Sequence, residues 1–316
     1  MAEQVPGAAL PAGALEAPQA GPVRDFSHLT PGPPGVLRPV GTSMFVVDGR
    51  RPHDVPLDPL RLAILSTGRS GTSWLRLMLS ELYTLDMIAG PLLPADVAWP
   101  NLPTRCLIQA HWYPPTFSVP LDEIFYRLPG GLVEAYDLRV VTVARHPFDT
   151  LVSALRFSAL LDPEAQHVPL EANSPSGQAF LREATSQWAE RTLAISREWW
   201  GLPGVLRVRY EDLVSDTPGE LAKLVAAIGE EPDRTVAEVA ALHQLQDLKS
   251  TYGDGLFWQG QPGLWRKLIP AGAALQIYEA NRAAFETMGY VCDPDPDLKA
   301  SEAEAAWRLL VSPSPK

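Results

Sequence analysis

The sequence predicts an α/β fold with three layers, α/β/α, in which helices cover both faces of a central parallel sheet. Three apolar segments have the composition of buried strands, and each runs into a helical pattern or a turn: residues 62–65, 138–144 and 205–209. Further helical patterns follow at residues 178–200, 218–228 and 271–288. Strands that alternate with helices pair in parallel, because each helix provides the crossover to the next strand.

The 316 residues are enough for one large domain with a tail at each end. We expect the domain over residues 60–292 and a C-terminal tail over 293–316. Residues 1–59 are rich in Pro, Ala and Gly and show no helical or strand period, which predicts a flexible leader. An edge strand at residues 45–47 is the alternative for part of that leader.

The turn between the first strand and the first helix has the composition of a phosphate-binding loop. Gly68 and Gly71 permit tight turns, so that free N–H groups and the positive end of the helix can point at an anion. Charged and hydroxyl side chains fill the rest of the loop: Arg69, Ser70, Thr72 and Ser73. An ordinary strand-to-helix turn rich in small residues is the alternative, because short motifs produce false matches.

The loop lacks the features of a nucleotide triphosphatase. In G-x-x-x-x-G-K-[ST] a Lys follows the second Gly, whereas Thr72 stands in that position here. Nucleotide hydrolysis is therefore disfavoured, and a P-loop kinase remains only as an alternative that would require magnesium.

A second anion-binding segment follows the strand at residues 138–144. Arg145 ends this strand, Pro147 suits the first turn of the next helix, and Ser153 lies two turns into it. A loop that folds back would bring the guanidinium and the hydroxyl onto one phosphate, a task that suits the planar donors of Arg.

Four segments in this order resemble the sulfotransferase family that uses 3′-phosphoadenosine 5′-phosphosulfate (PAPS). Residues 68–74 match the family's P-K-S-G-T-T-W loop, with Arg69 in place of its Lys. The family motif R-x-P-x-D-x-x-x-S is matched by Arg145, Pro147, Asp149 and Ser153. The segments 210–213 and 260–267 complete the resemblance, which extends over about residues 60–290.

The resemblance implies a P-loop sulfotransferase fold and roles for the matched residues. The loop from Gly68 to Trp74 would bind the 5′-phosphosulfate, and Arg145 and Ser153 would bind the 3′-phosphate. Tyr210 would reach the adenine, on which Trp74 would stack. PAPS would be the co-substrate, 3′,5′-bisphosphoadenosine (PAP) its product, and no metal would be required.

The resemblance also implies a catalytic base. The family's K-T-H segment reads Gln109-Ala110-His111 here, at the end of a predicted strand, where open α/β sheets place their ligands. His111 would take a proton from the acceptor. Because the Lys and the Thr are lost, Arg69 would carry more of the stabilisation of the leaving group. A structural His at a strand end is the alternative.

The family's R-K-G segment differs most, because it reads Trp258-Gln259-Gly260 here. Only Gly260 is kept. Arg266 and Lys267 are the candidate replacements for the missing cations at the 3′-phosphate. Trp258 would face the acceptor, pack over the nucleotide, or simply belong to the core.

Composition and net charge argue against some classes of binding partner and indicate the cellular compartment. The formal net charge of −11 argues against binding to nucleic acid or to anionic membranes. No signal peptide or apolar run of a membrane-spanning length is visible, so a cytoplasmic location is expected. Two cysteines fit a reducing compartment, and neither a disulfide nor a metal site is predicted. Formation of a homodimer is left open.

The acceptor is the least determined part. We expect a small molecule that offers a hydroxyl or, less readily, an amine. Aromatic residues after the predicted base either bind it or belong to the core: Trp112, Tyr113, Phe117, Phe125 and Tyr126. The polar segment 162–177 would form either a lid over the acceptor or a plain surface loop. A noncatalytic nucleotide-binding protein is the alternative to an enzyme.

Overall fold

The computed structural model describes the following residues: 38–39, 45–47, 58–89, 93–118, 126–161 and 174–311. Most of the predicted leader, Phe125, and most of the predicted lid segment lie outside the described residues.

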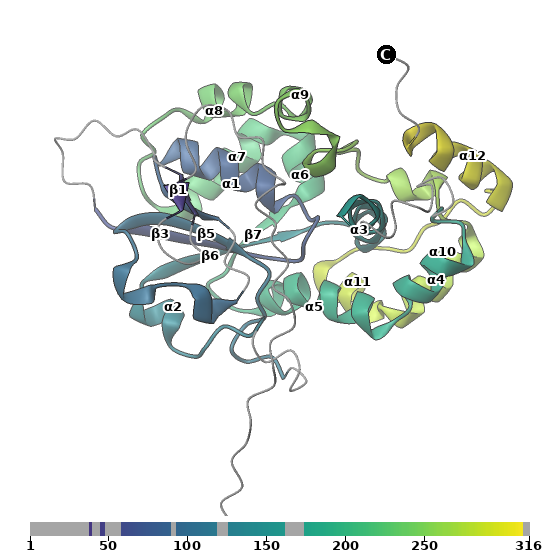
Figure 1. Ribbon diagram of the computed structural model, residues 1–316, viewed down its shortest axis with the longest axis horizontal. Helices are drawn as coiled ribbons and strands as arrows, with labels where there is room; N and C mark the ends of the chain where they lie inside the picture. Colours follow the sequence, from purple (N-terminus) through teal and green to yellow (C-terminus); the bar gives the residue numbers. More distant parts are fainter. Residues whose placement is uncertain are drawn as a thin grey trace, which may run out of the picture. The chain divides into compact units, whose positions relative to one another are not determined.

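One sheet holds the strands of the described part, in the order β1-β2-β4-β5-β3-β6-β7 (Figure 1). Their bounds are β1 (Arg38–Pro39), β2 (Phe45–Val47), β3 (Leu60–Leu65), β4 (Asp86–Ala89), β5 (Arg105–Ala110), β6 (Leu138–Ala144) and β7 (Leu206–Arg209). The central strands β4, β5, β3, β6 and β7 pair in parallel, as expected. β2 pairs antiparallel with β4, so residues 45–47 form the added strand that was the alternative to a flexible leader.

The register brings the carboxyl ends of the central strands to one edge. Leu65 at the end of β3 pairs with Ala110 at the end of β5, and Ala144 at the end of β6 pairs with Arg209 at the end of β7. The segments that follow these strands begin at this edge. It is the edge at which open α/β sheets bind their ligands.

Twelve helices are seen in the described residues, together with short 3-10 turns such as η7 (Leu264–Lys267). The helices are α1 (Thr72–Leu82), α2 (Leu132–Ala135), α3 (Pro147–Leu161), α4 (Gln178–Ala184), α5 (Gln187–Gly201), α6 (Tyr210–Ser215), α7 (Thr217–Ile228), α8 (Val236–Leu242), α9 (Leu245–Leu256), α10 (Ala271–Ala280), α11 (Arg282–Met288) and α12 (Ala300–Val311).

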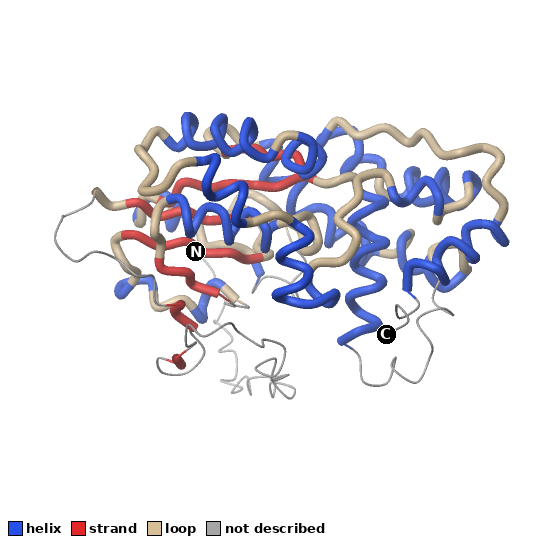
Figure 2. The backbone as a smooth tube through the Cα atoms, turned by 90° about the horizontal axis from the view of Figure 1, so that it is seen from above, coloured by secondary structure: helices blue, strands red, loops and turns tan. Residues whose placement is uncertain are grey.

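Alternate residues of the buried strands supply two cores, one on each face of the sheet. Helices cover both faces in Figure 1, and in Figure 2 further helices extend beyond the sheet on the right of the view. In β3, Leu62 and Ile64 pack with α1 and with α6 to α9, whereas Ala63 and Leu65 pack with α5. This alternation follows from the period of two along a strand. The three predicted layers are therefore confirmed. A third core lies among α3, α4, η7 and α10 to α12.

Two of the predicted helices are each divided in the structure. The pattern at 178–200 forms α4 and α5, with a break where Ser186 takes an extended conformation as the N-cap of α5. The pattern at 271–288 forms α10 and α11, separated by Asn281. The buried Asn281 amide donates to the carbonyl oxygens of Ala184 and Ile277, so it ties the break to the end of α4.

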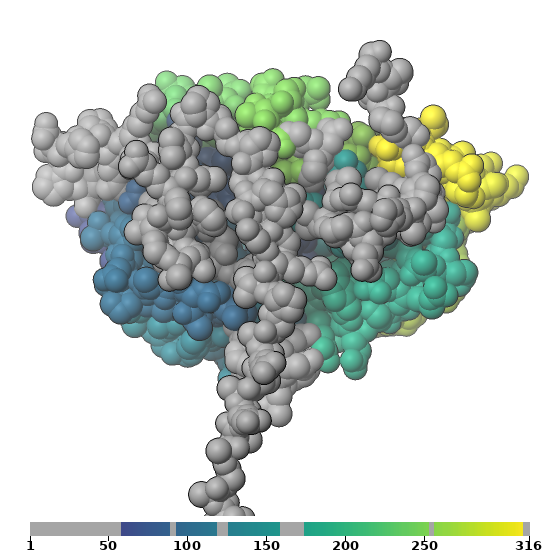
Figure 3. Space-filling model, viewed as in Figure 1, coloured from purple at the N-terminus to yellow at the C-terminus, as the bar shows by residue number. Residues whose placement is uncertain are grey.

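The predicted C-terminal tail contains α12. Its Trp307 is fully buried in the third core, beside residues of α4 and η7. Figure 3 shows the surface of α12 next to that of α4. No helix in the described ranges combines the length and the apolar character needed to cross a membrane.

Candidate functional site

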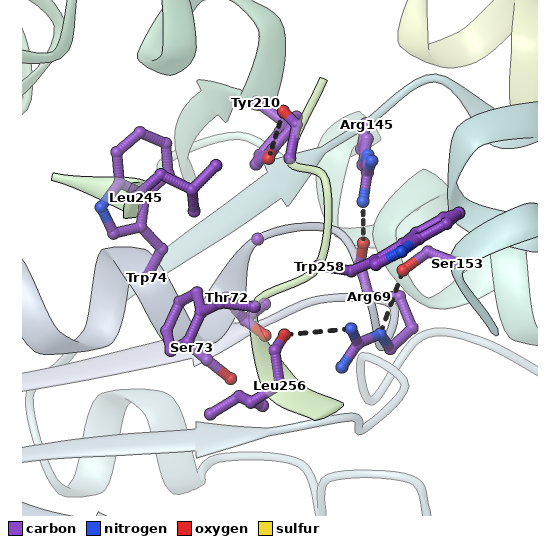
Figure 4. Close-up of a pocket in the computed structure, with 13 residues that line it drawn as sticks. Arg69, Thr72, Ser73, Trp74, Arg145, Ser153, Tyr210, Leu245, Leu256 and Trp258 are labelled. Atoms are coloured by element: carbon purple, nitrogen blue, oxygen red, sulfur yellow. Dashed lines mark hydrogen bonds between the residues drawn. The ribbon is translucent and has the colours of Figure 1, made fainter. Parts of the chain in front are cut away.

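A pocket opens at the carboxyl edge of the sheet, and most of the residues predicted to bind a nucleotide line it (Figure 4). Its lining consists of Arg69, Gly71, Thr72, Ser73, Trp74, Arg145, Ser153, Tyr210, Leu245, Leu256, Phe257, Trp258 and Gly260. Gly68, Ser70, His111, Arg266 and Lys267 are not among them. Four apolar residues of the lining come from α9 and the turn after it: Leu245, Leu256, Phe257 and Trp258. Of these, only Trp258 was singled out from the sequence.

The loop between β3 and α1 has the conformation that a phosphate-binding turn needs. Gly71 has φ of 102° and caps α1, and Arg69 has φ of 67°, a left-handed conformation that is uncommon for a residue with a side chain. The Ser70 hydroxyl donates to the Thr67 carbonyl oxygen at 2.7 Å, so it closes the loop instead of facing the pocket. The first N–H groups of α1 have no partner within the helix.

Buried hydroxyl groups join the loop between β3 and α1 to α5 and to β6. Thr67 and Ser196 of α5 bond to each other twice, from Thr67 N–H to the Ser196 hydroxyl at 2.8 Å and from Ser196 N–H to the Thr67 hydroxyl at 3.1 Å. The Ser196 hydroxyl also donates to the Val143 carbonyl oxygen of β6 at 2.9 Å. The loop is thus joined to the layer of helices behind the sheet.

Ser196→Ala should lower the free energy of unfolding by about 1–3 kcal/mol, because the buried Thr67 N–H and Val143 carbonyl lose their partner. Chemical denaturation measures this loss. Ser250→Ala is the matched control, since that exposed hydroxyl only donates to the Gln246 carbonyl oxygen within α9. Equal stabilities of the two variants would show that the network does not hold the loop.

Arg69 joins the two segments that were predicted to bind phosphates. Its Nε donates to the Ser153 hydroxyl at 3.2 Å, and its Nη2 donates to the Leu256 carbonyl oxygen at 3.1 Å. Its guanidinium lies over the Phe157 ring, 4.3 Å from the centroid. Burial, and after it the positive charges of Arg145 and Arg156, lower the pKa of Arg69 to about 10. The side chain therefore stays charged at neutral pH.

Arg145 approaches the same pocket from the end of β6. Its Nη1 donates to the Arg69 carbonyl oxygen at 3.0 Å, and its guanidinium lies 4.5 Å from the centroid of the Tyr210 ring. Figure 4 shows Arg69, Arg145 and Ser153 gathered on one side of the cavity. The structure thus brings together the side chains that the sequence predicted to hold phosphates.

Tyr210 and Trp74 form the aromatic part of the pocket. Their rings meet edge to face, with 6.2 Å between the centroids, and the Trp74 indole N–H donates to the His243 carbonyl oxygen at 2.8 Å. The Tyr210 hydroxyl donates to the Gly260 carbonyl oxygen at 2.8 Å. Both rings are therefore held in place by hydrogen bonds at their polar atoms, and both line the pocket.

Asp149 fixes the last segment of the pocket. This buried carboxylate accepts from Gly263 N–H at 2.6 Å and from Trp265 N–H at 3.0 Å. Burial raises its pKa, while Arg145 opposes that shift. Because η7 is held in this way, Arg266 bonds to Asp293 at 2.6 Å, and Lys267 is exposed. The two predicted replacements for the missing cations are not brought to the pocket.

His111 follows β5 directly and lies beside the loop rather than in the lining of the pocket. Its Nδ1 is 2.7 Å from the Ser66 carbonyl oxygen. Because a carbonyl oxygen only accepts, Nδ1 carries the hydrogen, and Nε2 of the neutral ring keeps a free lone pair. Nε2 faces the loop, since a Cβ added to Gly68 would lie 3.5 Å from it.

The protein around His111 keeps its imidazole neutral. Although the side chain has an exposed face, the surrounding atoms exclude enough water to lower its pKa, and the charge of Arg69 adds to this effect. The hydrogen bond to Ser66 opposes the shift. A neutral imidazole with a free Nε2 can accept a proton at neutral pH.

Gln109, which stands where the family has Lys, lies on β5 and donates from its side-chain amide to the Thr72 hydroxyl at 3.2 Å. It therefore reaches the start of α1 without bringing a charge there. Trp112 and Tyr113 are buried in the core behind the sheet, which favours their structural interpretation, whereas Tyr126 is exposed. Across the described ranges no three His, Cys, Asp or Glu side chains gather as a metal site.

No protein-family model matches the sequence, and no curated protein matches it. Solved structures do share the fold. The mouse sulfotransferase SULT7A1, complexed with PAP, superposes with a TM-score of 0.52 at 18% sequence identity, and the match covers 73% of this chain and 89% of that one. Retinol dehydratase, in complex with androsterone and inactive cofactor PAP, superposes with a TM-score of 0.50 at 17% identity, covering 82% of this chain and 90% of that one.

At this identity the likeness is one of fold. It confirms the sulfotransferase-type α/β fold that the short motifs implied, with its central parallel sheet between layers of helices.

Proposed function

We propose that this protein is a sulfotransferase that moves the sulfuryl group of PAPS to a hydroxyl, or less readily an amine, of a small molecule in the cytoplasm. One observation carries the proposal: Arg69, Arg145 and Ser153, from the two segments expected to bind phosphates, line one pocket with Tyr210 and Trp74. A ligand with two anionic ends and an aromatic base fits such a lining.

The loop from Gly68 to Trp74 would bind the 5′-phosphosulfate with its amide groups and Arg69. Arg145 and Ser153 would hold the 3′-phosphate, and the adenine would lie against Trp74 and Tyr210 near Gly260. Arg69 contacts both residues that would hold the 3′-phosphate, because its Nε donates to the Ser153 hydroxyl and its carbonyl oxygen accepts from Arg145. It is therefore suited to stabilise negative charge on the leaving bisphosphate.

In the reaction the acceptor oxygen attacks sulfur and forms a new S–O bond, while the bond from sulfur to the phosphate oxygen of PAP breaks. Nε2 of His111 takes the acceptor proton, and the electron pair of the broken bond leaves with PAP. The position of Nε2 beside Gly68 supports this role, because Gly68 begins the loop that would hold the sulfate. The acceptor would enter from the exposed face of His111.

Calorimetric titration with PAP, in parallel with ATP plus magnesium, tests the donor without knowledge of the acceptor. We expect PAP to bind in the presence of EDTA and more tightly than ATP with magnesium. A preference for ATP with magnesium would assign the protein to the kinases instead. Binding of PAP and PAPS without transfer to any acceptor in a broad screen would favour a noncatalytic nucleotide-binding protein.

Arg145→Ala should weaken PAP binding by roughly 10- to 100-fold, because a guanidinium that faces a phosphate contributes charge-assisted hydrogen bonds. The same titration measures the loss. Arg182→Ala is the matched control, since that arginine is exposed on α4 and does not line the pocket. An unchanged Kd for PAP in Arg145→Ala would contradict the assignment of Arg145.

A further inference from the structure

A third arginine lies beside the pocket and belongs to none of the motifs. Arg156 is on α3, three residues and therefore about one turn beyond Ser153, so the two side chains share a face of the helix. Only 7% of Arg156 is exposed. Its guanidinium carbon lies over the Trp258 ring, 4.9 Å from the centroid, and Trp258 itself lines the pocket.

Trp258 is held in position from a second direction. Its ring meets that of Trp307 edge to face, with 5.8 Å between the centroids and 77° between the planes. Trp307 belongs to α12 and is fully buried. Trp258 is thus fixed between α12 and α3, and Figure 4 shows its indole close to Ser153. A ring that cannot turn away is a firm support for a stacked guanidinium.

Arg69, Arg145 and Arg156 form a cluster of positive charges that repel one another. Both Arg145 and Arg156 lower the pKa of Arg69, which means that each guanidinium is close enough to disfavour the charge of the next. The three guanidinium groups therefore lie near one another, and Arg69 donates to Ser153 in the lining of the pocket. An anion that binds at Ser153 would be attracted by all three positive charges.

The position of Arg156 also suggests a replacement for the cations that the R-K-G segment lacks in this sequence. Trp258 and Gln259 stand where the resembling family has the Arg and the Lys of R-K-G, so two cations are missing from the 3′-phosphate site. Arg266 replaces neither, because its guanidinium bonds to Asp293 and stacks on Trp265. Arg156 does reach this place, since it lies directly on the ring of Trp258.

We propose that Arg156 is a donor-binding residue that contacts the 3′-phosphate together with Arg145 and Ser153, and that Trp258, supported by Trp307, orients its guanidinium. One of the two cations that the family supplies from the R-K-G turn would come here from α3. This inference rests on the proposed function, because it assigns a phosphate of the same donor.

The test compares the Kd of PAP with that of adenosine 5′-phosphate, which lacks the 3′-phosphate, in wild type and Arg156→Gln. Wild type should bind PAP more tightly. Arg156→Gln should weaken PAP by roughly 10- to 100-fold and leave adenosine 5′-phosphate nearly unchanged. Arg156→Lys should fall between them, because Lys keeps the charge without the planar fork. Arg182→Gln removes the same charge from an exposed position and should bind both nucleotides like wild type.

The two hypotheses fail in different ways. If wild type showed no preference for PAP, the proposed function itself would be wrong. If wild type preferred PAP and both Arg156 variants kept the full preference, Arg156 would have no part in binding. Should Arg156→Gln fail to fold, as judged by thermal unfolding, the comparison of Arg156→Lys with wild type decides.

A double-mutant cycle tests the orienting role of Trp258. Trp258→Leu should weaken PAP binding in the presence of Arg156 and have a much smaller effect in the background of Arg156→Gln, because the two changes remove one interaction. Additive losses would mean that Trp258 contacts the nucleotide independently of Arg156, which would overturn its assignment as an orienting residue.

Discussion

His111→Ala should lose roughly 10²- to 10⁴-fold in turnover and keep its affinity for PAP, because general base catalysis contributes about that factor. The structure supports this separation of effects. His111 lies outside the lining of the pocket, whereas its Nε2 faces the loop at Gly68. Steady-state kinetics with any acceptor found in a screen, combined with calorimetry for PAP, measures both quantities.

The activity of the wild type should also report the titration of His111. Its folded pKa lies below the ordinary value of 6.5 because of burial and the charge of Arg69. Above that lowered pKa the imidazole is neutral and can accept a proton. The acidic limb of kcat/KM should therefore lie below pH 6.5, with a plateau at neutral pH, and it should vanish from the residual activity of His111→Ala.

His243→Ala is the matched control, because burial also lowers the pKa of this imidazole, whose Nδ1 bonds to the Val239 carbonyl oxygen at the end of α8. It should retain nearly full turnover. If His111→Ala turned over as fast as His243→Ala, His111 would not be the base, and its bond to Ser66 would be purely structural.

The strands at the centre of the sheet were predictable because they are buried on both faces. Residues 62–65 form a continuous apolar run, residues 138–144 are mostly apolar, and in the structure nearly all of them are inaccessible to solvent. β4 escaped the sequence analysis, since Asp86–Ala89 has only four residues and begins with an acidic one. Pairing with β5 on one side and β2 on the other makes it a strand.

The breaks in the long helical patterns depend on tertiary contacts. Asn281 fits a helical period as well as its neighbours do, and nothing in the local sequence shows that its side chain will reach the Ala184 carbonyl oxygen. A pattern of apolar residues continues through such a break, because both helices pack on the same core. Sequence periodicity therefore predicted the buried face and missed the division.

In the candidate site, too, sequence motifs predicted some residues, whereas tertiary contacts determined others. Arg69, Arg145 and Ser153 were found because each belongs to a motif with fixed spacing, and the structure brings them together. Arg266 was chosen because it follows the R-K-G position in the chain, yet η7 directs it to Asp293. Arg156 was missed, although its spacing of three from Ser153 places it on the same face of a helix. That signal alone could not reveal the stacking on Trp258, which is more than a hundred residues away in the sequence.

Gly71→Ala should abolish measurable binding of PAP, because the new side chain has no room and an unfavourable backbone. A Cβ at this position would lie 2.5 Å and 2.9 Å from two carbons of the Tyr210 ring. Its φ of 102° is a conformation that residues with side chains rarely adopt. To accept the methyl group, the loop or Tyr210 has to move, and either movement disturbs the pocket. Calorimetry with PAP measures the loss.

Gly272→Ala is the matched control for this change. Gly272 lies in α10, where an added Cβ meets nothing within 4 Å, so the variant should bind PAP like wild type and gain about 0.5–1 kcal/mol of stability. The pair separates a general effect of replacing Gly by Ala from the specific clash with Tyr210. Normal PAP binding by a folded Gly71→Ala would mean that the contact between the loop and Tyr210 does not shape the donor site, and the position assigned to the adenine would have to be abandoned.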